Sequence, residues 1–337
     1  MHRFEPSLHS LVLLACLCLA APVSAQPRHY GADHHMHIRS ADASAVWGAL
    51  CDSMPAACGP DYSGPPEPSD ASDIIAVLDD AGVEKGAILS LGYFYGFPEL
   101  AGSDYDKPDF VRAENAFVAE QVALYPDRLC GFFSVNPLAP YALDEVRYWA
   151  AQDDHCGLKL HFANSNFSFQ DPEQVAQIKQ ILSVLSEHDL ALVIHMRNRN
   201  PEYGAADAQV LIDALAEAAP DITVQIAHMA GWGSYDAGTD AALGTFVGAF
   251  EAGSLKRENL YFDLAAVVMA DQPPEALKPL PGRLRQIGLS HILFATDWDA
   301  LESPREYIQT LQTQLGLTAE EWEMVRENQA PYFEDGK

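Results

Sequence analysis

Eight short apolar runs alternate with longer stretches of helical periodicity along this 337-residue chain, and this alternation limits the fold more than any other feature. The apolar runs begin near residues 30, 86, 131, 157, 190, 222, 259 and 291. Helices are expected at 71–81, 111–125, 143–151, 173–188, 207–219, 274–287, 304–314 and 319–328, with a weaker, glycine-containing one at 239–252. Eight strand–helix repeats predict a parallel sheet closed into a (β/α)₈ barrel. We expect one such domain over residues 26–337.

Residues 1–25 have the pattern of a secretory signal peptide. An apolar stretch at 11–23 is too short to span a bilayer comfortably, and Val23-Ser24-Ala25 is a small-residue cleavage pattern. Lipid attachment at Cys16 is the alternative, because Leu13-Leu14-Ala15 precedes that cysteine. The sequence therefore predicts a periplasmic or secreted protein with no integral membrane segment once the signal is removed.

The chain is strongly acidic, with 48 Asp and Glu against 20 Lys and Arg and a formal charge of −28. Such a surface repels phosphate backbones, so a nucleic-acid partner is not expected. A small-molecule substrate is compatible with this charge, because a metal ion and one arginine can dominate a pocket locally. The sequence leaves open whether the chain forms a homodimer.

Four cysteines follow the signal, and an even number in an exported protein favours disulfides. Cys51 and Cys58 lie in one predicted loop. Cys130 and Cys156 immediately precede the third and fourth strands, which are neighbours about 4.8 Å apart in a barrel. We therefore predict the pairs Cys51–Cys58 and Cys130–Cys156.

Two connections are longer than a barrel needs, and both follow strands, so both are expected at the face where barrel active sites form. The first covers about residues 40–70 and is rich in Pro, Gly, Ser and Asp. The second is the aromatic run Gly92-Tyr93-Phe94-Tyr95-Gly96-Phe97-Pro98. This run is either one wall of a pocket or a plug between loops.

The first strand carries Asp33-His34-His35-Met36-His37. Side chains alternate along a strand, so Asp33, His35 and His37 are expected on one face and His34 and Met36 on the other. Two imidazoles at i and i+2 can bind one metal ion, although the same pair also occurs in strands without a metal.

Ionisable residues also stand at the ends of later strands, where buried parallel strands are usually apolar. Each has an ordinary structural explanation, such as capping a loop or the next helix. Together, however, imidazoles and a carboxylate from strands 1, 5 and 8 supply three nitrogens and one oxygen, which suits Zn²⁺. The ionisable residues at the ends of these later strands are Lys159, His161, His195, His228 and Asp297.

With these motifs in place, the chain resembles the amidohydrolase superfamily, in the amidohydrolase-related branch that includes aminocarboxymuconate-semialdehyde decarboxylase. The motifs cover nearly the whole mature chain: Asp33-His34-His35-Met36-His37, Tyr125-Pro126-Asp127-Arg128-Leu129 leading into Gly131-Phe132-Phe133-Ser134-Val135-Asn136-Pro137, Gly157-Leu158-Lys159-Leu160-His161, Val193-Ile194-His195, Ile226-Ala227-His228, Phe294-Ala295-Thr296-Asp297 and Glu327-Asn328.

The resemblance implies one divalent metal ion, Zn²⁺ or alternatively Mn²⁺. It makes His228 the catalytic histidine and assigns four metal ligands: His35, His37, His195 and Asp297. Binuclear relatives bridge two metals with a carboxylated lysine on the fourth strand, where Lys159 stands. In this branch the Gly-x-Lys-Leu motif accompanies a single metal, so a mononuclear site is expected.

These residues predict an exported metal-dependent hydrolase that acts on a small ester, lactone or amide. Asp297 would take the proton of a metal-activated water, and His228 would polarise a carbonyl or move a proton. Arg197 would grip a substrate carboxylate, unless it forms a surface salt bridge, and Lys159 and His161 are further substrate-contact candidates. The alternatives are a non-oxidative decarboxylase and an exported metal-binding protein without catalysis. Export favours hydrolysis.

Overall fold

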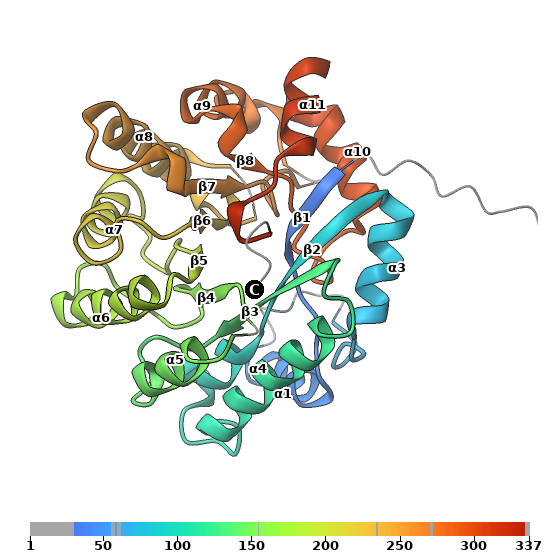
Figure 1. The fold of residues 1–337 in the computed structure, drawn as a ribbon, viewed down its shortest axis with the longest axis vertical. Coiled ribbons are helices and arrows are strands. Elements are labelled where there is room, and N and C mark those ends of the chain that lie inside the picture. The colour runs from blue at the N-terminus through green and yellow to red at the C-terminus, as the bar shows by residue number, and fades with distance from the viewer. Residues whose placement is uncertain are drawn as a thin grey trace, which may run out of the picture.

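The computed structural model describes residues 30–54, 58, 62–153, 155–233, 235–269 and 272–333. Eight strands form one sheet in sequence order, and each pairs in parallel with the next. Figure 1 shows them as a central ring with the helices outside. The predicted barrel is confirmed. The strands are β1 Tyr30–Met36, β2 Val83–Leu89, β3 Leu129–Ser134, β4 Gly157–His161, β5 Ala191–His195, β6 Val224–Ile226, β7 Leu260–Asp263 and β8 Ile292–Leu293.

Backbone hydrogen bonds between β1 and the segment that follows β8 complete the ring. His34 N donates to Phe294 O over 3.1 Å, and Asp297 N donates to His35 O over 2.8 Å. Strand β8 is shorter than the predicted strand, which ran to Asp297. These bonds nevertheless hold Asp297 beside the end of β1.

Helices follow the strands, and their bounds lie close to the predicted positions. They are α3 Ala71–Ala81, α4 Pro108–Val122, α5 Ala142–Ala150, α6 Pro172–His188, α7 Ala205–Ala218, α8 Ala237–Ala252, α9 Leu280–Ile287, α10 Pro304–Gln314 and α11 Ala319–Glu327. Asp70, Ser303 and Thr318 each begin a helix with a capping box, which satisfies amides of the first turn. Helix α8 is complete despite its glycines.

Two expectations about helices were wrong. The predicted loop at 40–70 contains α1 (Ala41–Ser53), whose first turn is capped by the Ser40 hydroxyl. The first half of that segment is rich in alanine, and the prolines and glycines that indicated a loop come mostly after it. The predicted helix at 274–287 is divided into η5 (Pro274–Leu277) and α9, because Pro279 has no amide proton to continue the first helix.

The strict alternation predicted for β1 fails at His34. Asp33 pairs with Gly86 and Met36 with Ile88, so three steps along β1 oppose two along β2. This irregularity turns the His34 ring toward the C-terminal segment, where it accepts a hydrogen bond from Ala330 N at 3.2 Å. His34 therefore does not share a face with Met36, and a bulge that adds one residue is the physical reason.

The last described segment, η7 (Pro331–Phe333), lies inside the ring of strands, where Figure 1 draws it in red. Tyr332 packs with Leu89, Phe132 and Val193 in the interior cluster. Its hydroxyl donates to Gln225 Oε1 over 2.6 Å. The C-terminal segment thus fills the part of the barrel beneath the strand ends.

The structure contains both predicted disulfides. The Cα atoms of Cys51 and Cys58 are 5.6 Å apart, and those of Cys130 and Cys156 are 5.9 Å apart. The second bridge joins β3 to the residue just before β4.

The predicted signal at 1–25, with Cys16, lies outside the described residues. Among the residues that are described, no helix has the length and apolar character to cross a membrane.

Candidate metal centre

The end of β1 presents two imidazoles whose orientation is fixed by carbonyl or carboxylate acceptors. His37 Nδ1 lies 2.7 Å from Leu89 O, and His35 Nδ1 lies 3.1 Å from a carboxylate oxygen of Asp263. A carbonyl oxygen can only accept, so His37 carries its proton on Nδ1 and its Nε2 is left as a potential metal ligand.

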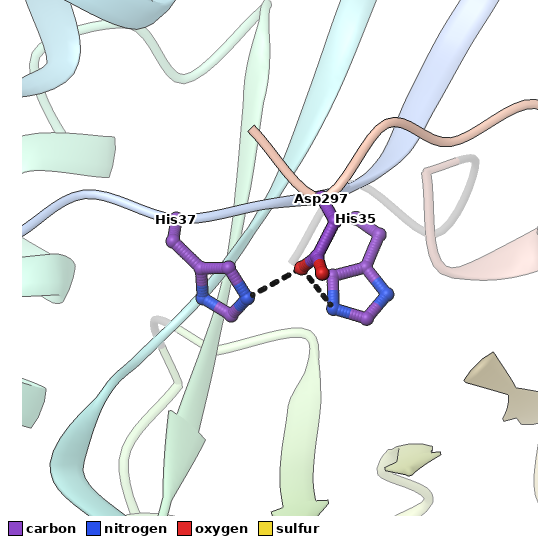
Figure 2. A group of neighbouring side chains, drawn as sticks. All are labelled: His35, His37 and Asp297. Carbon is purple, nitrogen blue, oxygen red and sulfur yellow. Dashed lines mark ion pairs between the residues drawn. The ribbon is translucent and has the colours of Figure 1, made fainter. Parts of the chain in front are cut away.

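Asp297 lies between these two rings, as Figure 2 shows. Its Oδ1 is 3.3 Å from His35 Nε2 and 3.2 Å from His37 Nε2. The three side chains are buried, and their ligand atoms lie within 4.8 Å of one another. The structure therefore brings together three of the four ligands predicted from the sequence.

Charge and burial set the protonation states that metal binding requires. Burial alone would raise the pKa of the Asp297 carboxyl, but the adjacent His35 and His37 rings hold that pKa well below its usual value. Burial, together with the charge of Lys159, lowers the pKa of His35 well below its usual value. The centre thus offers an ionised carboxylate beside a neutral imidazole.

The fourth predicted ligand, His195, ends β5 and stacks on His161 of β4 with ring centroids 3.8 Å apart. It is 1% exposed, and neither of its ring nitrogens has a hydrogen-bond partner. Leaving two polar atoms of a buried ring unsatisfied costs free energy, and a metal ion would satisfy one of them. His195 does not belong to the group of three within 4.8 Å, so its role as a ligand stays a prediction.

Lys159 lies beneath the centre rather than in the cavity. It is 1% exposed, and its Nζ is 3.1 Å from His35 Nε2. Burial lowers its pKa to about 8, although the charges of Asp297 and Asp263 oppose this effect. Lys159 therefore contacts a ligand candidate and is not among the residues that line the cavity, and its predicted contact with substrate stays a prediction.

His228 follows β6 in a left-handed turn, with φ of 55° at His228, 50° at Met229 and 62° at Ala230. Residues other than glycine rarely adopt this conformation, and such strain is concentrated at functional sites. The His228 amide donates to Asp263 Oδ1 over 2.8 Å, and its Nδ1 lies 2.8 Å from Ala265 O. These two contacts use the backbone amide and Nδ1 of His228 and do not involve its Nε2.

Asp263 is the buried residue that the sequence interpretation missed. It ends β7, contacts His35 Nδ1 and accepts hydrogen bonds from the His228 amide and from Gln225 Nε2. It also forms a second group with His35 and His228 that could hold a metal ion. The available signal was an aspartate closing an apolar run, the same pattern that indicated Asp297.

A cavity of about 600 Å³ opens over the centre. Its floor includes His37, His161, His195, His228 and Asp297. Tyr93, Phe94 and Phe97 of the aromatic run line it, so that run forms a pocket wall. Further lining residues come from the α1 region and the loops after the strands, and they include Arg39, Trp47, Asn164, Arg199, Trp232 and Asp299.

Arg197 does not face this cavity. Its guanidinium forms an ion pair with Asp236 at 2.8 Å and lies over the Tyr203 ring at 5.1 Å. This arrangement matches the salt-bridge alternative considered for Arg197. The cavity arginines are instead Arg39 and Arg199, and no sequence pattern distinguished them because loop folding brings them to the wall.

A family model described as Amidohydrolase matches residues 32–327, a span that holds all the centre's residues. This chain belongs to the amidohydrolase family. Its mononuclear or binuclear state and its likeness to aminocarboxymuconate-semialdehyde decarboxylase stay predictions. No curated protein matches this amidohydrolase.

Solved structures with the same fold include enzymes named for different reactions. A 5-carboxyvanillate decarboxylase from Novosphingobium aromaticivorans with bound manganese is 13% identical, with a TM-score of 0.62 over 91% of this chain and 97% of that one. A probable 2-pyrone-4,6-dicarboxylic acid hydrolase from Acinetobacter baumannii is 15% identical, with a TM-score of 0.54 over 88% and 96%. An amidohydrolase from Burkholderia multivorans with bound zinc is 14% identical, with a TM-score of 0.56 over 88% and 96%. At these identities the similarity establishes the fold alone.

Proposed function

We propose that this amidohydrolase is an exported, metal-dependent hydrolase that uses a metal-activated water on a small ester, lactone or amide. The observation that carries the proposal is the ionised Asp297 carboxylate between His35 and His37, open to the cavity. A carboxylate that touches both rings is placed to receive a proton from water at that point.

His35, His37 and Asp297 would hold one divalent metal ion, with His195 as the fourth ligand. Zn²⁺ suits this set of nitrogen and oxygen donors, and Mn²⁺ is the alternative. When bound, such an ion supplies Lewis-acid activation, which lowers the pKa of water from 15.7 to about 7.

The chain's own residues then move the protons. As the oxygen of water bonds to the acyl carbon, Asp297 takes the proton of that water. The bond to the leaving oxygen or nitrogen breaks, and Asp297 returns the proton to that atom. Because His228 Nδ1 points to Ala265 O, the His228 Nε2 carries a lone pair. His228, in the cavity floor, is therefore placed to act as a second proton acceptor.

Non-oxidative decarboxylation is the second candidate, because structures of the same fold are named as decarboxylases. That reaction needs an acid substrate and releases carbon dioxide, whereas hydrolysis releases an acid and an alcohol or amine. The two disulfides are consistent with export to an oxidising compartment, which favours hydrolysis over a cytoplasmic role in ring breakdown.

The test is a screen of the purified, metal-loaded protein against esters, lactones, amides and aromatic carboxylates. We expect acid release from at least one acyl substrate and no carbon dioxide from the aromatic carboxylates. The Asp297→Asn variant is the control, because it keeps an oxygen ligand but loses the proton acceptor. Carbon dioxide release without hydrolysis would make the decarboxylase assignment correct.

A further inference from the structure

Several large aromatic rings line the cavity. Trp47 of α1 and Phe94 of the aromatic run stack with centroids 5.3 Å apart, and Phe97 packs against Phe94 at 5.5 Å. Trp232 also lines the cavity and is 48% exposed, and its ring centroid lies 5.4 Å from that of His195 and 5.1 Å from that of His228. A planar ring entering this space would meet aromatic faces near the metal ligands.

The positive charges of the wall are already neutralised. Arg39 forms an ion pair with Asp299, and Arg199 forms one with Glu99 at 2.5 Å. Among the described residues that line the cavity, no lysine is present and neither arginine has an uncompensated charge. Arg199 is held further by its Nε, which donates to Ala163 O over 2.7 Å.

Because both arginines of the cavity wall are paired, binding of an anionic group is unfavourable anywhere in the cavity except at the metal. A carboxylate in the outer cavity would lose water without gaining a free cation, and burying an unpaired charge is costly. The Asp297 carboxylate also lines the cavity, whereas the Asp299 charge is paired with Arg39. One acyl group at the metal can be polarised there, but the rest of the molecule has to be free of anionic groups.

From these walls we infer that the substrate class is a neutral, ring-bearing ester or lactone with no carboxylate of its own. The inference rests on the proposed hydrolase function and narrows it to one class. In the reaction the acyl carbon–oxygen bond breaks, the oxygen of water bonds to that carbon, and a proton of water passes to the released alcohol or phenol. This class differs from the dicarboxylic acid named for the Acinetobacter baumannii relative.

The kinetic test compares phenyl acetate with 4-carboxyphenyl acetate on the zinc-loaded protein. The added carboxylate does not weaken the leaving group, so a lower kcat/KM reports on the cavity. We expect kcat/KM to fall at least about tenfold for the carboxylated ester, which corresponds to about 1.4 kcal/mol. Methyl 4-acetoxybenzoate carries an uncharged substituent one methyl group larger and a slightly better leaving group, so it should be cleaved at least about as fast as phenyl acetate. Equal or higher kcat/KM for the carboxylated ester would overturn the inference.

A single variant tests the role of the paired arginine. Glu99→Gln removes the partner of Arg199 and leaves its positive charge free, so the ratio of kcat/KM for the carboxylated to the neutral ester should rise severalfold. Glu217→Gln breaks an ion pair with Lys179 away from the cavity and should leave that ratio unchanged. An unchanged ratio in Glu99→Gln would show that the Arg199–Glu99 pair does not exclude carboxylates.

A binding arm separates this inference from the proposed hydrolysis. Acetophenone and 4-acetylbenzoate resemble the two esters but cannot be hydrolysed. Both can be titrated while the tryptophan fluorescence is followed, to which Trp47 and Trp232 in the cavity contribute. We expect tighter binding of acetophenone. If it binds tighter but no ester is cleaved, the cavity inference holds and the hydrolase proposal fails. Tighter binding of 4-acetylbenzoate would contradict the cavity inference, whatever the activity.

Discussion

At the scale of single residues, the Nδ1 contacts of the histidines explain how the centre is organised. The Nδ1 atoms of His37 and His228 each contact a backbone carbonyl oxygen, and Nδ1 of His35 contacts the Asp263 carboxylate. Each ring therefore turns Nε2 away from its fixed partner. Such outer contacts set the tautomer of a ligand and typically affect metal affinity 10- to 100-fold. They need no metal to form, so the chain builds this part of the centre by folding alone.

Replacement of the strand-end residues separates ligands from proton carriers. His35→Ala and His37→Ala each remove a ligand nitrogen, so metal content and turnover should fall together. His228→Ala should keep most of its metal and lose about 10²–10⁴-fold in turnover, the usual contribution of a positioned acid or base. Metal content measured beside turnover for each variant checks this. A metal-free His228→Ala protein would make His228 a ligand, possible through the second group with His35 and Asp263.

Sequence and structure agree best where a residue's role depends on its own strand. His35, His37 and Asp297 follow from the pattern because the carboxyl ends of all barrel strands meet at one face. The paired state of Arg39, Arg197 and Arg199 does not follow from any local pattern. Each pair joins residues from different loops, and loop geometry depends on the finished fold.

At the scale of elements, α1 is the principal difference between expectation and structure. It packs against η1 (Gly92–Gly96) and α4 rather than against the barrel wall, so its apolar positions do not follow the pattern of a barrel helix. Trp47 of this helix lines the cavity. Helix α1, which was not predicted from the sequence, therefore forms part of the cavity wall.

The buried carboxyl of Glu114 in α4, which contacts the N-terminal end of α1 through Ser40, predicts that the stability of the protein depends on pH. Burial raises the pKa of Glu114 in α4 to about 7, although the hydrogen bond from the Ser40 hydroxyl opposes this. The folded state therefore keeps a proton on Glu114 that the unfolded chain releases above about pH 4.5. As the pH rises from about 4.5 to about 7, the free energy of unfolding falls by about 3 kcal/mol in all.

Glu114→Gln keeps an acceptor for Ser40 but cannot titrate. Between about pH 5 and about pH 8 its free energy of unfolding should fall less than that of the parent protein. Denaturant unfolding at both pH values measures the difference. Glu120→Gln, on an exposed position of the same helix, is the matched control and should behave like the parent. Equal pH dependence in Glu114→Gln and the parent would contradict the assignment.

At the scale of the whole molecule, the eightfold alternation predicted the barrel because each strand–helix repeat can bury its apolar face in few other ways. The charge of −28 repels a phosphate backbone, so the prediction of no nucleic-acid partner rests on this charge alone. The C-terminal plug could not be foreseen, since Tyr332 reaches Gln225 across 107 positions of sequence.

The central claim is that one metal ion at His35, His37 and Asp297 supports hydrolysis, with Lys159 uncarboxylated beneath it. The direct measurement is a titration of the metal-stripped protein with Zn²⁺, following bound metal and ester hydrolysis together. We expect turnover to rise in proportion to bound metal and to saturate near one ion per chain, without a response to bicarbonate. Hydrolysis that is independent of metal would contradict the claim, as would saturation at two ions with loss of both in Lys159→Ala.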